Sequence, residues 1–170
     1  NFAGDAFCAT QAADLPAAGR AYLPSASYRE MTEWALPVTQ QLTYDRVTHN
    51  LQDDRRWEEL KPFVRGGYWR NFKVKYPETN EMYCRMMMVS KRLAQADEQG
   101  FDGEDVYWAR RELYRAQCNC SYWHGAFGGI YLPHLRNAVY NHLIAADNLL
   151  DKAFDISQPY VHIDTEDYDF

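Results

Sequence analysis

Residues 118–133 carry the densest set of side chains that could recognise a polar ligand. This stretch holds a Trp123–His124 pair, three glycines and two cysteines. An indole offers a flat apolar face, and an imidazole beside it offers nitrogens that donate or accept hydrogen bonds. Glycine lets the backbone adopt positive φ and approach other groups closely. The combination suits a polar, ring-shaped ligand such as a sugar, which stacks on one face and forms hydrogen bonds at its edge.

A purely structural interpretation of the same pair stays open. Trp123 could plug the interior of a helical bundle, and His124 could hydrogen-bond a backbone carbonyl. Tyr122 and Phe127 are expected to be packing residues. A loop that only joins two helices is usually shorter and more polar than 118–133. Spacing alone does not decide between the two interpretations.

A second cluster lies at Trp69, Arg70 and Asn71. The guanidinium fork and the carboxamide suit sugar hydroxyls, and the indole suits the face of a sugar. The alternative is a tryptophan buried at a helix junction, with Arg70 paired to a carboxylate. On the residues alone, this structural alternative is the favoured interpretation.

No pair of carboxylates in the chain is marked as catalytic. Hydrolysis or transfer at a glycosidic bond usually needs two carboxyl groups flanking that bond. Glu30 and Glu33 lie beside a capping pattern, and the acidic tail 164–169 lacks the glycine turn and closing glutamate of an EF-hand loop. We therefore predict solvated or capping roles for these acids. His134 and His142 stand eight residues apart without a third ligand, so no metal and no cofactor are predicted.

The composition indicates one globular domain with a sizeable core. The chain has 170 residues, of which 46% are hydrophobic and 25% are charged, as in ordinary globular proteins. A net charge of −6 and a pI of about 5.3 argue against a nucleic-acid groove, which needs a basic surface. With 13 Tyr and 5 Trp, part of the aromatic excess is expected to line a surface. No apolar run reaches the length of a membrane span.

Four cysteines, at positions 8, 84, 118 and 120, are expected to be reduced thiols. Cys118 and Cys120 are too close for an ordinary disulfide, and one C-x-C without a second pair is a weak zinc motif. Reduced thiols favour a cytoplasmic location, and no signal peptide is visible. Because the chain begins with Asn1 rather than Met, we expect an excised piece or a processed product.

Hydrophobic spacing predicts an all-α fold, a compact helical bundle of about five to six helices. Apolar residues recur at steps of three and four in three segments: 82–96, 106–116 and 132–150. Stacked against one another, these stripes would bury a continuous core. The sequence therefore predicts that the longest helices form the centre of the domain.

Shorter helices are predicted ahead of these stripes: 27–36, 37–52, 57–64 and 68–76. A capping box at Ser27 begins the first of them, and Pro37 ends it. Pro77 is expected in the first turn of the next helix, which Gly100 should close. Asp102 is expected to cap the helix that follows.

The two ends of the chain depart from the helical pattern. In residues 1–24 apolar residues do not recur at regular steps, so this segment is predicted to be irregular. After Pro159, apolar and polar residues alternate, which is typical of a strand. We therefore predict three segments: an N-terminal segment 1–24, a helical domain 25–156 and a strand-like tail 157–170.

Three stretches resemble signature regions of glycoside hydrolase family 57, and they come in that family's order. The family's last signature region, as found in its 4-α-glucanotransferase and α-amylase branch, is similar to AQCNCSYWHGAFGGIYLPHLR at 116–136. The other two are YLPSASYREMTEW at 22–34 and RGGYWRNF at 65–72. The resemblance covers about residues 15–155, and its motifs are long and rich in tryptophan.

The resemblance implies the helical middle domain that follows the catalytic barrel of an α-1,4-glucan-acting retaining glycosidase or 4-α-glucanotransferase. Residues 1–24 would then be the trailing end of the barrel, and 157–170 the start of a β-sandwich domain. The helical domain would complete a glucan-binding groove beside the barrel. Family members carry a Glu nucleophile and an Asp acid on that barrel, so the isolated chain is predicted to be inactive.

The resemblance also implies substrate-binding residues for an α-glucan or maltooligosaccharide: Trp123, His124, Cys118, Asn119, Trp69, Arg70 and Asn71. The first four belong to the last signature region, which faces the barrel cleft in relatives. Some relatives carry Asp where this chain has Cys120. The expected partners are the glucan and the barrel and β-sandwich domains of the parent chain, with no nucleic acid and no membrane.

Two other functions stay open from the sequence. One is a stand-alone helical carbohydrate-binding or scaffold module without catalysis, and the other is a metal-dependent enzyme built on the histidines. A reading frame continuous with a barrel and a β-sandwich would separate the first from the interpretation as an enzyme domain. Hydrolase and transferase share one covalent intermediate, so the sequence does not separate these two activities.

Overall fold

The computed structural model describes residues 29–124 and 128–157, where all regular structure is helical. The α-helices are α2 (Arg29–Trp34), α3 (Val38–Gln52), α4 (Trp57–Leu60), α5 (Trp69–Lys75), α6 (Pro77–Glu98), α7 (Glu104–Ala116) and α8 (Pro133–Ala153). Short 3-10 turns are η1 (Lys61–Phe63), η2 (Asn119–Ser121) and η3 (Gly129–Tyr131). The predicted all-α class is confirmed, and the described residues form seven α-helices where about five to six were predicted. The Ser27 cap, segment 1–24 and the strand-like tail lie outside the described residues.

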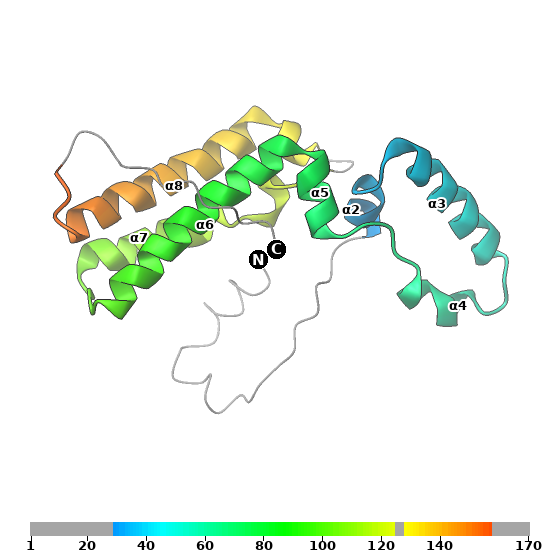
Figure 1. The fold of residues 1–170 in the computed structure, drawn as a ribbon, viewed down its shortest axis with the longest axis horizontal. Coiled ribbons are helices and arrows are strands. Elements are labelled where there is room, and N and C mark those ends of the chain that lie inside the picture. The colour runs from blue at the N-terminus through cyan, green and yellow to red at the C-terminus, as the bar shows by residue number, and fades with distance from the viewer. Residues whose placement is uncertain (1–28, 125–127, 158–170) are drawn as a thin grey trace, which may run out of the picture.

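The three long helices α6, α7 and α8 lie side by side and form the main bundle (Figure 1). The predicted stripes meet in its core, where these side chains are at most 4% exposed: Met82, Val89, Leu93, Ala96, Val106, Ala109, Leu113, Ala116, Val139, Leu143, Ala146 and Leu150. Full burial of a Val, Leu or Met side chain contributes about 1.5–3 kcal/mol. The spacing of apolar residues therefore accounts for this bundle. No described helix is both long and apolar enough to cross a membrane.

α7 and α8 make the most extensive helix pair among the described elements, and both helices bury small residues in the core. Ala109, Ala116 and Ala146 are at most 1% exposed. A methyl side chain lets two helix backbones approach closely, and a close-packed interior has little room for further methylene groups. These alanines therefore fix the spacing of the two helices.

A charged clamp joins α6 to α8 at one end of the bundle. The Arg92 guanidinium donates to Asp147 and, at 2.5 Å, to Asp151. The two carboxylates lie one helical turn apart, and the Arg92 side chain is only 18% exposed. Because a planar guanidinium donates in fixed directions, this clamp sets the register of α6 against α8.

The connection from α6 to α7 confirms one predicted helix end and corrects a predicted cap. The Phe101 N–H donates to the Ala96 carbonyl at 3.0 Å, and Gly100 has a φ of 78°. This is the Schellman ending that glycine favours. The predicted Asp102 cap is wrong, because the extended residue that precedes α7 is Gly103, one position later, and it provides no side-chain cap.

α2, α3 and α4 form a second unit, which α5 connects to the bundle (Figure 1). The connection depends on a pair of glycines. The Gly67 N–H donates to the Thr32 carbonyl at 2.6 Å, and a Cβ on Gly66 would lie 2.3 Å from the same oxygen. The segment before α5 therefore crosses the backbone of α2 at a distance that only glycine permits.

Ala146→Leu should destabilise the bundle because the larger side chain has no space between α7 and α8. Overpacking of this kind typically costs about 1–3 kcal/mol. Ala138→Leu, on the exposed face of the same helix, adds the same atoms to solvent and is the matched control. Urea unfolding followed by circular dichroism measures both variants. Equal free energies of unfolding would show that α7 and α8 do not pack closely at Ala146.

Candidate functional site

Three stretches that are distant in the sequence meet at the ring of Phe72, which is fully buried in α5. Trp69 stacks on Phe72 with ring centroids 5.5 Å apart. The rings of Tyr76 and His124 lie 4.4 and 5.4 Å from the same ring, and Met31 of α2 packs beside them. The loop 118–133 and the segment around Trp69 are thus parts of one unit. We call its rings the aromatic cluster: Trp34, Trp69, Phe72, Tyr76, His124 and Tyr131.

The imidazole of His124 lies inside the aromatic cluster, with only 6% of the residue exposed. Trp34, Tyr76 and Tyr131 surround it at centroid distances of 4.9, 4.6 and 5.0 Å. The first two meet it edge-on, an arrangement that the charge distribution of aromatic rings favours. Nε2 is buried without a hydrogen-bond partner among the described residues. The carbonyl bond of the structural alternative is therefore not present at this nitrogen.

The surroundings of His124 disfavour its protonated form. Burial lowers the pKa of the imidazole and the Lys75 ammonium lowers it further, while Glu30 acts in the opposite direction. An imidazolium would lose its solvation among the rings. His124 is therefore neutral near pH 7, where it serves as a packing ring that keeps one donor and one acceptor nitrogen.

Lys75 ties α5 to the end of α2. Its ammonium donates to the Trp34 carbonyl at 2.9 Å and to the Leu36 carbonyl at 2.6 Å. The last carbonyls of a helix lack partners within the helix and carry partial negative charge, so a cation is favoured there. Burial lowers the pKa of Lys75. These two bonds fix the backbone that places the Trp34 ring against His124.

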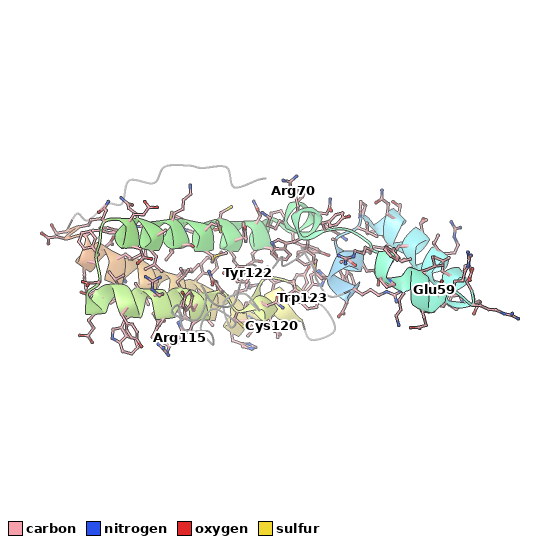
Figure 2. All side chains as sticks on the ribbon, turned by 90° about the horizontal axis from the view of Figure 1, so that it is seen from below. Glu59, Arg70, Arg115, Cys120, Tyr122 and Trp123 are labelled. Atoms are coloured by element: carbon pink, nitrogen blue, oxygen red, sulfur yellow. The ribbon has the colours of Figure 1, made fainter. Side chains whose placement is uncertain are left out.

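Trp123 lies where the bundle meets α2 (Figure 2). Its half-buried side chain packs against the buried cluster formed by Met31, Ala35 and Phe72, and its carbonyl accepts a hydrogen bond from the Ile130 N–H at 3.0 Å. Gly129 has a φ of 48°, and a Cβ there would lie 1.9 Å from the Trp123 carbonyl oxygen. The loop closes on Trp123 through a contact that only glycine permits, and the indole combines a packed part with an accessible part.

Tyr122 is a packing residue, as predicted. It is 6% exposed, and its O–H donates to the Ala116 carbonyl at 2.8 Å. Burial raises the pKa of the phenol far above its ordinary value, so it stays a donor. Tyr122 thereby anchors the start of the loop to the end of α7. Phe127, the other predicted packing residue, lies outside the described residues.

Cys118, Asn119 and Cys120 form an exposed segment at the start of the loop. Both thiols are free, as the prediction of reduced cysteines requires. In Figure 2, Cys120 lies on the same lower side of the molecule as Arg115 and next to Trp123. Within 29–124 and 128–157, no three His, Cys, Asp or Glu side chains are grouped so that they could hold a metal ion.

Trp69, Arg70 and Asn71 take three different positions on α5. Trp69 is half-buried against Phe72, as the structural alternative expects. Arg70 is exposed at the upper edge in Figure 2, opposite Cys120, and pairs with no carboxylate of the described residues. Asn71 caps the start of α5, because its Oδ1 accepts a hydrogen bond from the Tyr68 N–H at 2.9 Å. The structure therefore does not bring Arg70 and Asn71 to the loop.

Sequence reasoning missed Trp34, Tyr76 and Tyr131 as the neighbours of His124. A signal existed for two of them, since Trp34 ends the first family-like stretch and Tyr131 lies in the last one. Tyr76 stands only before a helix-starting proline. The order of motifs along the chain does not reveal which rings meet in space, and this information came with the fold.

The bundle and the aromatic cluster define a helical domain that positions a tryptophan-bearing loop against an aromatic support. Comparison with known protein families shows which family of helical domains this one matches. Residues 67–150 match the family described as alpha-amylase/4-alpha-glucanotransferase, middle domain. The chain belongs to this family, and the resemblance drawn from its three signature stretches is confirmed.

Some of the relatives that are similar to this chain are named alpha-amylase, and others are named 4-alpha-glucanotransferase. It is 44% identical over 135 residues to alpha-amylase 1 of Dictyoglomus thermophilum, which covers 79% of this chain and 19% of that protein. It is 46% identical over 132 residues to the 4-alpha-glucanotransferase of Thermococcus litoralis, covering 78% and 18%. The crystal structure of the Thermococcus litoralis enzyme matches with a TM-score of 0.55 and 47% identity, over 74% of this chain and 18% of that chain. The chain spans about a fifth of the length of these relatives.

Gly129→Ser should disrupt the loop, because the new Cβ collides with the Trp123 carbonyl and serine disfavours a positive φ. Strain of this kind typically costs about 1–3 kcal/mol. Gly103→Ser is the matched control, since nothing lies within 4 Å of a Cβ there and serine suits a helix N-cap. Thermal unfolding of both variants tests the prediction, and an unchanged melting temperature for Gly129→Ser would contradict it.

Stability should fall in acid because of His124. The pKa of this imidazole in the folded chain lies below the value of about 6.5 for an unfolded histidine, so the unfolded state binds the proton first as pH falls. The contribution is fully present above about pH 6.5 and is lost below it, until the folded pKa is passed. His124→Phe should remove this part of the dependence. Urea unfolding from about pH 8 to pH 5 compares the two proteins, and parallel stability curves would refute the prediction.

Proposed function

We propose that this domain completes the α-1,4-glucan-binding cleft of a retaining glycosidase or 4-α-glucanotransferase, beside a catalytic barrel in the same polypeptide. The family match supports the placement in such an enzyme, and the relatives' names, alpha-amylase and 4-alpha-glucanotransferase, support the substrate class. One observation carries the proposal: Trp123 is a half-buried indole, packed against the buried cluster of Met31, Ala35 and Phe72, in the loop that resembles the family's last signature region.

Trp123 would bind the apolar face of a glucose residue by stacking. Such aromatic contacts contribute about 0.5–1.5 kcal/mol beyond the burial of area. The indole packs against the buried cluster that contains Phe72, and its backbone carbonyl accepts the hydrogen bond from Ile130. A side chain that is already fixed loses little freedom on binding, so more of the contact energy appears as affinity.

His124 would act as a positioning residue and, through Nε2, as a hydrogen-bonding one. The ring fills the space behind the loop, and a buried polar atom without a partner costs about 1–3 kcal/mol. A sugar hydroxyl or a polar group of the barrel would supply the missing bond. The low pKa of His124 keeps the ring neutral, so it can accept as well as donate.

The remaining predicted ligands are supported unequally. Cys118 and Asn119 are exposed on the segment that leads to Trp123, which supports a place at the rim of the cleft. Trp69 would act through Phe72 as part of the support. Arg70 and Asn71 stay predicted glucan ligands with less support, since one projects from the opposite edge and the other caps α5.

The proposed enzyme would take its two catalytic carboxylates from the barrel. In a retaining mechanism, one carboxylate forms a covalent glycosyl intermediate. Water then gives hydrolysis, and a glucan hydroxyl gives transfer. A β-sandwich domain would be the other partner within the polypeptide. The free thiols of Cys118 and Cys120 support a cytoplasmic location. No observation favours a stand-alone binding module.

Trp123→Ala in the full-length enzyme should weaken glucan binding or turnover by about tenfold or more, because the stacking surface and its water exclusion are lost. Trp123→Phe, which keeps an aromatic face, should recover much of the loss and is the matched control. Turnover of maltooligosaccharides and the melting temperature are measured on the same preparations.

A purely structural Trp123 would give a different pair of results. Truncation of a large core side chain costs about 3–5 kcal/mol of stability. A large drop in melting temperature, together with unchanged kinetics per folded molecule, would therefore refute the proposed binding role.

A further inference from the structure

The outer face of α7 carries an aromatic pair that the proposed cleft does not use. Charged residues three or four positions away from the adjacent rings of Tyr107 and Trp108 share this face. All five side chains are exposed: Glu104, Tyr107, Trp108, Arg111 and Arg115. Tyr107 is 53% exposed and Trp108 is 41% exposed, although the other face of the same helix is fully packed. Single exposed apolar residues are common, but two adjacent large rings with fixed neighbours are a feature that requires an explanation.

Polar neighbours hold the two rings in a defined arrangement. The Trp108 Nε1–H donates to the Glu104 carboxylate at 3.1 Å. The rings of Tyr107 and Trp108 meet at 78° with centroids 5.3 Å apart. The Arg111 guanidinium lies 5.8 and 6.0 Å from the two centroids, a cation–π geometry. The result is a corner of two rings with hydrogen-bond donors and an acceptor at its rim.

The geometry points to a second α-glucan-binding site at Tyr107 and Trp108, distinct from the loop site at Trp123. A pyranose ring presents C–H groups on its face and hydroxyls at its edge, which matches an aromatic face bordered by a guanidinium and a carboxylate. The inference rests on the proposed function for the nature of the ligand. The location of the second site is inferred from the exposed rings of α7.

A protein partner fits this surface less well. Charged side chains border the two rings on the same face, at Glu104, Arg111 and Arg115. A specific protein interface needs roughly 1,000 Å² or more of buried area with a contiguous core, which two rings in a charged frame do not provide. One or two sugar residues match the size of the corner.

The new site would receive the same glucan chain as the cleft, further along its length. α7 leads directly into the segment before Trp123, and Arg115 and Cys120 lie on the same side of the molecule (Figure 2). At a rise of about 1.5 Å per residue, Trp108 lies roughly 12 Å along the axis from the end of α7. A glucan already bound in the cleft would thus gain affinity from the second site only if it is long enough to reach both places.

Native electrophoresis of the 170-residue chain in gels containing soluble starch tests the site without catalysis. The wild-type chain should be retarded relative to gels without polysaccharide. Trp108→Ala should raise the apparent Kd for starch about three- to tenfold, whereas Trp108→Phe should retain most of the binding. Phe63→Ala removes an 83% exposed ring elsewhere on the chain and is the matched control. Circular dichroism confirms that each variant is folded.

The outcomes separate this inference from the proposed function. Retardation that Trp123→Ala abolishes and Trp108→Ala leaves unchanged would overturn the second site and leave the cleft proposal standing. No retardation of the wild-type chain by starch would overturn the second site, while the kinetics of Trp123→Ala in the full-length enzyme test the cleft separately. Concentration-dependent dimerisation that Trp108→Ala removes, without starch binding, would assign the face to a second copy and overturn the glucan assignment.

Discussion

The packing of Phe72 is the contact on which the functional part of the domain depends. α5 has only seven residues, and a helix of that length has too few internal hydrogen bonds to be stable alone. Its position comes from burying Phe72 against Trp69, Tyr76 and His124. Because these rings come from α5 and from the loop, removing the apolar contact would release both at once. The site is therefore a product of tertiary packing.

Electrostatics and packing reinforce each other around this ring. Lys75 neutralises the carbonyl end of α2, and His124 stays uncharged because it is buried beside that ammonium. An imidazolium at the same place would be repelled by Lys75 and poorly solvated. The positive charge of Lys75 thus lies at the edge of the cluster, where its ammonium donates to backbone carbonyls. The centre of the cluster carries no charge. This arrangement leaves Nε2 of His124 as a buried polar atom without a hydrogen-bond partner among the described residues.

The long helices could be predicted from sequence, because apolar residues at steps of three and four determine which face is buried. Val106, Leu113, Val139 and Leu143 are buried as the spacing predicts. The Asp102 cap failed because acidic residues near a helix start do not reveal which residue becomes extended. Within the site, the motifs identified Trp123 and His124, but burial of His124 depends on rings from three separate segments. Local spacing carries no information about such contacts, so the exposure of each candidate had to come from the fold.

The Arg92 clamp has a consequence for the reach of the loop. α8 begins directly after η3 and ends near the carboxylates that Arg92 holds, while α6 begins beside the aromatic cluster. Between Pro77 and Arg92 the helix rises roughly 22 Å. The rise of the helices therefore sets the distance along the bundle between the loop and the Arg92 clamp. The side chains of the loop do not affect this distance. Substitution of the loop's exposed side chains would leave the distance between the loop and the clamp unchanged.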